Sequence, residues 1–408
     1  MLSRSQAAFR LRLSASRVSI VGAARLRPRT SLAPVPASQF HSSTRRHFTA
    51  PSATLRQSQE LPKAPFPIFT TVNDFRTWRK KAEKEGKTVG FVPTMGALHD
   101  GHLSLVKASL AENDLTVVSI FVNPAQFAPT EDLAAYPRTL PSDIEALEKL
   151  AAGSATSPSS SSSSSSHGGI AAIFAPTVTE MYPSPDGKAF TQHVADQVGA
   201  FVEVHGLQHE MEGASRPTFF RGVATVCTKL FHIVAPHRAY FGQKDIQQAI
   251  LLRRLVLDLC FAHPEGPEAV RVLPTSRDPG DGLALSSRNA YLTQKARPYA
   301  TALYKALQAG QAAWEQHVQG QGQERVAETL RRAREVAQQE AERAAEDGIQ
   351  IDVLYISLND PISLGSLEGA TGDGGKRGAI LSGAAMIKDG PDGRATRLID
   401  NVLLGFAM

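Results

Sequence analysis

Two histidines in one short turn are the residues of this 408-residue chain best placed to do chemistry. His99 and His102 stand three apart, with Gly101 between them, at the end of the segment Pro93–His102. An apolar stretch precedes the segment and a helical pattern follows it, so backbone N–H groups and a positive helix terminus should face one spot. Two imidazoles there can donate to phosphate oxygens as negative charge develops. The same pair could also be a metal site or a helix cap.

A second polar segment, Phe241–Gln248, offers a cation for a phosphate. Lys244 can hold a phosphate as a mobile point charge, and Asp245 can accept a hydrogen bond from a ribose hydroxyl. Gln248 lies one helical turn beyond Lys244, so both side chains can face one cleft. The alternative is an ordinary solvated helix start with Asp245 as its cap.

The third segment, Asp281–Asn289, combines two hydroxyls with a guanidinium. Ser286 and Ser287 precede Arg288, and Gly282 lets the chain approach closely. Such a loop can act as a phosphate clamp that closes over a triphosphate. Taken alone the pattern is weak, because Ser-Ser-Arg occurs by chance in many loops.

A fourth polar pair follows the second predicted strand of the chain. Asn123 and Gln126 stand where open α/β sheets bind their ligands, beyond the carboxyl end of a strand. Gln126 offers both a donor and an acceptor, which suits a hydroxy acid better than a bare phosphate. A polar turn without a ligand is the alternative.

The elements that must position these motifs alternate between strand and helix. This alternation predicts an α/β fold with a doubly wound parallel sheet. After about residue 290 a long charged stretch predicts helices, and three later apolar stretches predict a small antiparallel sheet. The predicted strands are 87–92, 115–122, 171–174, 270–273, 351–358, 384–387 and 396–403, and the predicted helices are 75–86, 102–113, 143–150, 225–234, 246–259 and those within 299–347.

Composition divides the chain into segments. Two domains are expected, 68–276 and 277–408, after a linker at 60–67; a serine-rich insertion occupies 154–169 and a glycine-rich loop occupies 365–378. Only two cysteines, Cys227 and Cys260, are present, which excludes a disulfide framework and a cysteine-rich zinc site. No uninterrupted apolar stretch has the roughly 18 residues of a membrane span.

The positive net charge of +5 is concentrated at the N-terminus. Residues 1–59 hold ten arginines, no lysine and no acid, so the remaining chain carries about −5. An arginine- and serine-rich segment without acids is typical of a mitochondrial transit peptide, with a disordered basic tail as the alternative. The location of the charge therefore favours a targeting signal over a nucleic-acid-binding site, and neither a nucleic acid nor a membrane is expected to bind.

The four motifs, in this order, resemble the pantothenate synthetase (pantoate–β-alanine ligase) family. The resemblance runs from about Phe69 to the C-terminus, excluding the serine and glycine insertions. It extends to further segments, namely Tyr136–Arg138, Met181–Pro183, Glu212–Gly213, Arg216–Pro217, Arg221–Thr225 and Thr396–Asp400.

This resemblance implies a Rossmann-like domain of the HIGH-type nucleotidyltransferase superfamily, a smaller α+β C-terminal lid domain and a homodimer. It also implies a reaction in two steps. The carboxylate of (R)-pantoate attacks the α-phosphate of Mg-ATP, which gives pantoyl adenylate and pyrophosphate. The amine of β-alanine then attacks the acyl carbon, and pantothenate and AMP result.

The resemblance also carries roles to individual positions. The catalytic residues would be His99, His102, Lys244 and Arg288, and pantoate would bind Gln126 and Gln248, with β-alanine also at Gln126. Asp143 would contact Mg²⁺. The ATP-binding residues would be Met95, Gly96, Ala97, Leu98, His99, Asp100, Gly101, His102, Gly242, Gln243, Lys244, Asp245, Ser276, Leu285, Ser286, Ser287 and Arg288.

The sequence departs from the family pattern at two places. Phe219 stands where the family usually has histidine, so no polar role is assigned to it, and the segment Arg277–Asp281 is one residue longer than usual, which affects the alignment of Ser276. His205 and His209 are interpreted as surface residues because no third metal ligand is evident. Two other functions stay open: a nucleotidyltransferase whose product keeps the nucleotide, and an RNA-binding protein that uses the basic arm.

Overall fold

The computed structural model describes residues 61–131, 133–154, 169–317, 322–370, 375–391 and 393–408. All the described residues belong to one compact unit, which spans residues 60–408. The predicted targeting segment, the basic arm, most of the serine-rich insertion and residues 371–374 of the glycine-rich loop lie outside the described residues. In the described part of the chain, no helix combines the length and the apolar character that crossing a membrane requires.

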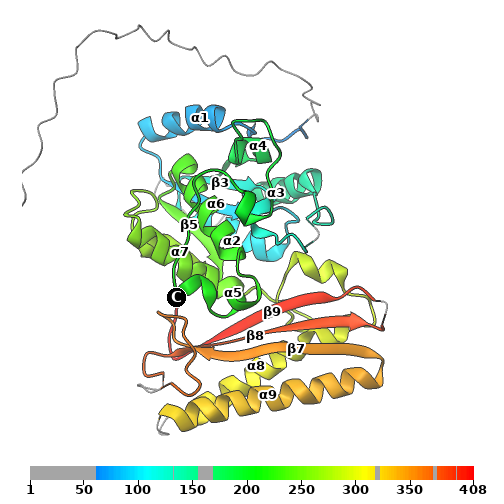
Figure 1. Ribbon diagram of the computed structural model, residues 1–408. Coiled ribbons are helices and arrows are strands. Elements are labelled where there is room, and N and C mark those ends of the chain that lie inside the picture. Colours follow the sequence, from blue (N-terminus) through cyan, green and yellow to red (C-terminus); the bar gives the residue numbers. More distant parts are fainter. Residues whose placement is uncertain (1–60, 132, 155–168, 318–321, 371–374, 392) are drawn as a thin grey trace, which may run out of the picture. The chain divides into compact units, whose positions relative to one another are not determined.

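A six-stranded parallel sheet forms the N-terminal part of this unit (Figure 1), which confirms the predicted α/β class. Its strand order, β1-β4-β3-β2-β5-β6, reverses direction between β2 and β5, and such a switch point is where doubly wound sheets bind ligands. The strands are β1 (Ile68–Phe69), β2 (Val89–Thr94), β3 (Leu115–Ile120), β4 (Gly169–Phe174), β5 (Arg238–Gly242) and β6 (Val270–Leu273).

The strands are continuous apolar runs because helices cover the sheet. Phe91, Val117 and Val118 are completely buried. The prediction that β2 ends before Pro93 was wrong: β5 pairs with β2 only at Gly90 and Phe91, so on that side the missing N–H of proline costs no hydrogen bond. The main helices are α1 (Val72–Lys84), α2 (Asp100–Glu112), α3 (Leu140–Ser154), α6 (Phe219–Val234) and α7 (Ile246–Asp258), and the short ones are α4 (Val178–Met181) and α5 (Glu212–Ser215).

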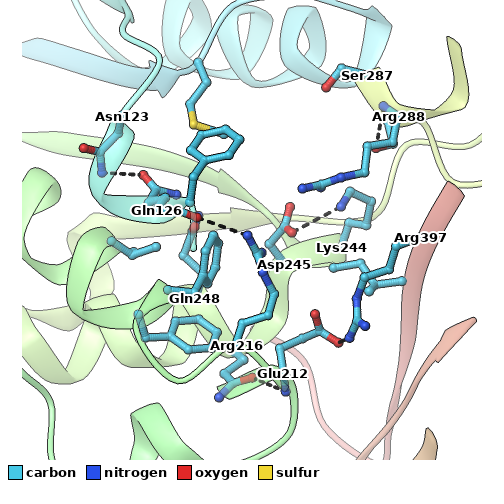
Figure 2. A pocket seen from close by; sticks show the side chains of 18 of the residues that line it. Asn123, Gln126, Glu212, Arg216, Lys244, Asp245, Gln248, Ser287, Arg288 and Arg397 are labelled. Carbon is cyan, nitrogen blue, oxygen red and sulfur yellow. Dashed lines mark hydrogen bonds and ion pairs between the residues drawn. The ribbon is translucent and has the colours of Figure 1, made fainter. Parts of the chain in front are cut away.

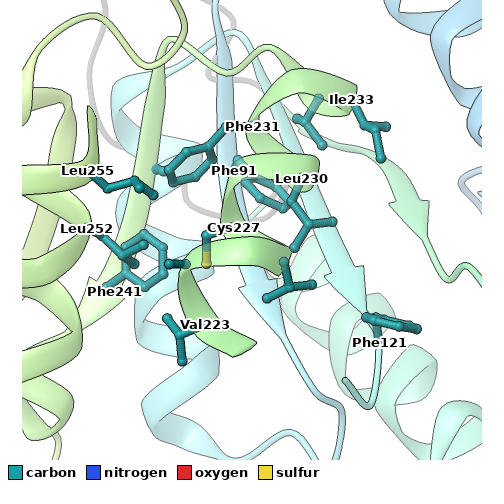
Figure 3. Packing of buried hydrophobic residues seen from close by; sticks show 14 of the residues in the cluster. Phe91, Phe121, Val223, Cys227, Leu230, Phe231, Ile233, Phe241, Leu252 and Leu255 are labelled. Atoms are coloured by element: carbon teal, nitrogen blue, oxygen red, sulfur yellow. The ribbon is translucent and has the colours of Figure 1, made fainter. Parts of the chain in front are cut away.

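Helix α6 forms the centre of the largest core cluster (Figure 3). It begins at Phe219, six residues before the predicted start at Thr225. The prediction began too late because Gly222, a poor helix former, interrupts the helical pattern in the first turns. Gly222 has a packing role: a Cβ there would lie 2.1 Å from the carbonyl oxygen of Ala125, in the turn that follows β3. Cys227 is buried on the same helix, whereas Cys260 is exposed, and both thiols are free.

The C-terminal part confirms the predicted helices and the small antiparallel sheet, whose order is β7-β8-β9. Trp314, Leu330 and Leu381 join the two helices and the sheet in one core. The predicted strand 384–387 was much too short, because the observed strand covers Ala379–Asp389. Its glycine, alanine and serine residues have low strand propensity, and pairing with a strand on each side stabilises it. The elements are α8 (Ala302–Gln316), α9 (Gly322–Glu346), β7 (Ile349–Asn359), β8 (Ala379–Asp389) and β9 (Thr396–Leu404). The boundary near residue 276 stays a prediction.

Candidate active site

A cleft of about 560 Å³ opens at the switch point between β2 and β5. Its volume suits a ligand of nucleotide size. The turns after β2, β3 and β5 line it on one side, and residues of β8, β9 and the loop 286–288 line it on the other (Figure 2). The four motifs, which are far apart in the sequence, therefore meet at one place.

The turn after β2 has an unusual backbone that Asp143 holds in place. Gly96 and Ala97 both have positive φ, at 83° and 51°, and such a conformation needs support when a side chain is present. The Asp143 carboxylate supplies that support from α3: Oδ1 accepts from the Leu98 N–H at 2.8 Å, and Oδ2 accepts from the Ala97 N–H at 3.1 Å. Thr139 donates its hydroxyl to the same Oδ2 at 3.1 Å.

This arrangement gives Asp143 a structural role and does not favour the Mg²⁺ contact, which stays a prediction. The residue is only 3% exposed, does not line the cleft, and has both carboxylate oxygens engaged by donors of the protein. A carboxylate committed to backbone N–H groups orients a turn and has little left to offer a metal. In the described residues, no group of three or more histidine, cysteine, aspartate or glutamate side chains could hold a metal ion. Asp143 is therefore a structural support of the turn.

His99 is the N-cap of α2, and this role fixes which of its nitrogens carries the proton. Its Nδ1 accepts from the Gly101 N–H at 3.2 Å, so Nε2 keeps the proton and remains a donor. A Cβ at position 101 would lie 2.9 Å from that Nδ1, which explains the glycine in the H-x-G-H pattern. The sequence left a helix cap and a phosphate donor as alternatives for this histidine. In the structure Nδ1 caps the helix, and Nε2 is free to act as the donor.

The two histidines are neutral donors rather than cations at neutral pH. Burial, with Lys244 nearby, lowers the pKa of His99 to about 4. Burial, with His99 nearby, lowers the pKa of His102 to about 3. The ring centroids are 4.1 Å apart, so each imidazole disfavours a proton on the other. The cations of the cleft are therefore the lysine and the arginines that line it.

Lys244 follows β5 on the opposite side of the switch point. Its Nζ lies 3.2 Å from Asp245 Oδ1, and both side chains line the cleft with Gln248. Asp245 is nearly half exposed, so its carboxylate remains accessible to a ligand hydroxyl. This geometry agrees with the sequence-based interpretation of the segment as a phosphate and ribose site.

Asn123 sets the direction of the Gln126 amide in the short 3-10 helix Pro124–Gln126. Tyr182 donates its hydroxyl to Asn123 Oδ1 at 2.7 Å, so Asn123 Nδ2 donates to Gln126 Oε1 at 2.9 Å. The side-chain oxygen of Gln126 therefore already accepts a hydrogen bond from Asn123, and the side-chain N–H groups of Gln126 are available to a ligand in the cleft. Gln126 should therefore act there as a donor, which narrows the dual role expected from the sequence.

Arg216 lies beside this pair and is held on several sides. Its Nε and Nη2 donate to the two carboxylate oxygens of Glu131 at 2.9 and 2.8 Å. Nη2 also donates to the backbone carbonyl oxygen of Gln126 at 3.1 Å. The guanidinium lies 3.9 Å from the centre of the Phe219 ring. Phe219 therefore stacks on a cation and has no polar role, as expected.

The loop after β6 brings hydroxyls and a guanidinium to the cleft. Ser286 caps a short 3-10 helix by accepting from the Arg288 N–H at 3.3 Å, and Ser287 lines the cleft together with Tyr136. Ser276 lies behind this loop: its hydroxyl is 3.1 Å from that of Ser104 on α2, and its carbonyl accepts from the Leu285 N–H.

The predicted site residues fall into two groups. Those that line the cleft are Met95, His99, His102, Gln126, Lys244, Asp245, Gln248, Ser286, Ser287 and Arg288. Those in the supporting turns are Gly96, Ala97, Leu98, Asp100, Gly101, Gly242, Gln243, Ser276 and Leu285, and for them a contact with ATP stays a prediction. The exposed His205 and His209 lie outside the cleft, as expected.

Sequence reasoning missed the contribution of the C-terminal sheet. Glu212 accepts from Tyr355 Oη at 2.9 Å and from Arg397 Nη2 at 2.7 Å, and all three residues line the cleft. Arg394 lines it as well. Glu212 and Arg397 lie in segments that resemble the family, but no local pattern of residue types indicates that a strand so late in the chain completes the site.

The family model described as pantoate-beta-alanine ligase matches residues 67–403. This chain belongs to that family. A curated relative described as pantothenate synthetase, from Moorella thermoacetica, is 42% identical over 337 residues, which are 83% of this chain and 98% of that protein. The predicted fold class, a parallel α/β sheet followed by a smaller antiparallel sheet, agrees with this family, and the division into two domains stays a prediction.

Solved structures agree with this assignment. A pantothenate synthetase from Thermus thermophilus aligns with a TM-score of 0.61 at 37% identity, over 83% of this chain and 99% of that one. A pantoate–β-alanine ligase from Francisella tularensis, complexed with β-γ ATP and β-alanine, aligns with a TM-score of 0.55 at 28% identity, over 84% of this chain and 99% of that one.

Replacing Asp143 with asparagine tests its role as a support of the turn. The amide cannot accept from two backbone N–H groups as the carboxylate does, so we expect a loss of about 1.5–3 kcal/mol in the free energy of unfolding. Urea unfolding without any divalent cation measures this loss. Glu145→Gln, which changes an exposed carboxylate on the same helix, is the control and should be near neutral. A role as metal ligand would instead leave stability without the metal unchanged.

The low pKa of His102 predicts a pH-dependent stability. Below the unfolded-state pKa near 6.5 the unfolded chain binds a proton that the folded chain excludes down to about pH 3, so folding loses stability as the pH falls. This loss approaches about 1.4 kcal/mol per pH unit for one histidine. The wild type should therefore lose stability between pH 6.5 and 5 more steeply than His102→Gln, in urea titrations at each pH. Parallel losses in the two proteins would contradict the burial of a neutral imidazole.

Proposed function

We propose that this chain condenses (R)-pantoate with β-alanine and converts ATP to AMP and pyrophosphate, through a pantoyl-adenylate intermediate. One observation carries the proposal. The neutral donors His99 and His102 line the cleft. The cations Lys244 and Arg288 line it as well, and so does a separate amide pair, Gln126 and Gln248 (Figure 2). The first set suits a polyphosphate and the second suits a small hydroxy acid.

The first step must activate a carboxylate, which is a poor acyl donor at neutral pH. An oxygen of the pantoate carboxylate forms a bond to the α-phosphorus of ATP, the bond to the bridging oxygen breaks, and pyrophosphate leaves with the electron pair. Negative charge grows on the phosphate oxygens, where the His99 Nε2–H, Lys244 and Arg288 can donate. The attacking carboxylate carries no proton, so this step needs no general base, and the neutral imidazoles stabilise the growing charge by hydrogen bonding alone.

The second step uses the same cleft after pyrophosphate has left. The amine of β-alanine forms a bond to the acyl carbon, the bond from that carbon to the bridging oxygen breaks, and AMP leaves while the nitrogen loses a proton. Gln126 can hold the pantoyl oxygens through its amide N–H groups, because Asn123 occupies its carbonyl oxygen. Holding both reactants in one orientation is the main contribution of such a site.

Mg²⁺ enters this reaction as part of the substrate Mg-ATP. Among the described residues, four carboxylates line the cleft, and three of them pair with arginine: Glu131 with Arg216, Glu212 with Arg397 and Asp400 with Arg277. Asp245 is the fourth and pairs with Lys244. Because Mg²⁺ keeps waters and takes phosphate oxygens as ligands, it can arrive with the triphosphate and needs few protein ligands.

The other properties expected of the family are proposals as well. The bound ligands named for the Francisella protein, β-γ ATP and β-alanine, support ATP and β-alanine as substrates here. We also propose a homodimer, which light scattering would test, and a mitochondrial address. The composition of residues 1–59 supports the address. Imaging a fluorescent fusion with and without those residues would test it, and equal distributions would exclude a targeting role.

ATP–pyrophosphate exchange tests the proposed function. Because the adenylate forms before the amine enters, exchange should require pantoate and should not require β-alanine. Addition of β-alanine should then release AMP and pantothenate in equal amounts. Exchange that pantoate fails to stimulate would contradict the proposal. A product that retains the nucleotide would identify a nucleotidyltransferase instead.

A further inference from the structure

We propose that Asp400 and Asn401, adjacent residues in β9, are positioning residues that hold the two cationic segments of the ATP site at a fixed separation. The proposal rests on the proposed function, because it concerns the groups that would bind the triphosphate. Asn401 holds the turn that carries Lys244, and Asp400 holds the loop that carries Arg288. Both are almost completely buried, at 2% and 5% exposed.

Asn401 contacts the backbone of the turn after β5. Its single amide nitrogen donates to two consecutive carbonyls, those of Gln243 and Lys244, at 2.9 Å each. Its Oδ1 accepts from Gln243 Nε2 at 3.3 Å. The N-cap residue of the 3-10 helix Gln243–Asp245 is Gly242, which has no side chain that could cap it. Asn401 therefore sets the orientation of the turn, and with it the direction in which Lys244 leaves the backbone.

Asp400 acts on the other segment through Arg277. The Arg277 guanidinium donates to both carboxylate oxygens of Asp400, at 2.7 and 3.0 Å, and lies 3.5 Å from the centre of the Tyr304 ring. Arg277 forms a β-bridge with Ala284, and its Nη1 donates to the Gly282 carbonyl at 3.3 Å. This fixed arginine anchors the base of the loop whose tip presents the Ser286, Ser287 and Arg288 side chains to the cleft.

Asp400 and Asn401 are also held to each other and to the neighbouring strand. Asp400 Oδ1 also accepts from the Asn401 N–H at 2.8 Å. Both residues lie in the middle of a strand, where they pair with Gly383 and Ser382 of β8. β9 contacts both the turn after β5 and the 3-10 helix of the Ser286–Arg288 loop.

The chemistry needs such a unit because Lys244 and Arg288 repel each other. Both line the cleft, and both also line a second, small cavity beside Asp400. Two like charges on independent loops would move apart in the absence of the triphosphate, and the binding of ATP would then have to bring them together again. A rigid strand that holds both segments removes that cost and keeps the donors in place during the reaction. The C-terminal sheet is thus part of the ATP site as well as a cover.

Asn401→Asp separates positioning from a merely structural role. The carboxylate keeps the shape of the side chain but cannot donate to the two carbonyls, so the Lys244 turn should lose its orientation. We expect KM for ATP to rise about tenfold or more, with a lower kcat for pantoate-dependent exchange and KM for pantoate within about threefold of the wild type. If this variant does not fold, Asn401→Ser, which retains a small polar side chain, takes its place.

The matched control is Asn359→Asp in the same sheet. Asn359 is 3% exposed, and its Nδ2 also donates to a backbone carbonyl, that of Leu364 at 2.8 Å, but it does not line the cleft. This variant should lose a similar amount of thermal stability while KM for ATP stays unchanged. Asp400→Asn, which weakens the pair with Arg277, should raise KM for ATP in the same direction as Asn401→Asp.

The outcomes distinguish this inference from the proposed function. A normal KM for ATP in folded Asn401→Asp, or equal increases in KM for ATP and for pantoate, would overturn the positioning role. An equal rise in KM for ATP in the Asn359 control would do the same, because it would indicate general destabilisation. Calorimetric titration with Mg-ATP alone measures the affinity of each variant without any reaction. The inference can therefore be tested even if the wild type shows no pantoate-dependent exchange.

Discussion

The site depends on one constraint, which is that a polyphosphate needs donors whose positions are fixed before it arrives. The backbone turn after β2 meets this constraint through the buried Asp143 carboxylate, which accepts from two consecutive N–H groups beside residues with positive φ. That turn starts α2 and sets the direction of both histidines. The other elements of the site take their places around it: Lys244 across the switch point, and the Ser286–Arg288 loop on the far side of the cleft.

Charge in this cleft is divided between groups of different kinds. The histidines are buried and neutral, so they contribute directed hydrogen bonds, while Lys244 and Arg288 contribute the positive charge. Of the other cations of the cleft, Arg216 and Arg397 are paired with carboxylates, and Arg394 lies over the ring of Tyr291. This division suits a reaction in which an anion attacks a phosphate, because Lys244 and Arg288 bring positive charge to the part of the cleft where the triphosphate would lie. The net charge of the whole chain is dominated by residues 1–59 and gives no information on the distribution of charge in the cleft.

Much of this could be predicted from the sequence, and the misses have physical reasons. The H-x-G-H turn and Lys244 were recognisable because their chemistry is local, and the alternation of elements predicts the parallel sheet. The structural role of Asp143 was missed because a carboxylate that supports a turn and one that binds a metal look alike in sequence, and its contacts appear only in the structure. Asp400 and Asn401 were not recognised as parts of the site, since their partners lie more than a hundred residues away. Strand β8 was predicted too short because pairing on both sides stabilises its small residues.

The central claim is that the pantoate carboxylate attacks the α-phosphate of ATP in this cleft. The most direct measurement follows ¹⁸O from pantoate labelled in both carboxylate oxygens, with mass spectrometry of the products after complete turnover. One labelled oxygen should appear in AMP and the other in the amide carbonyl of pantothenate, because the bond formed to phosphorus remains when the acyl carbon is released. Label in pyrophosphate or inorganic phosphate, or two labelled oxygens in the pantoyl product, would contradict the account.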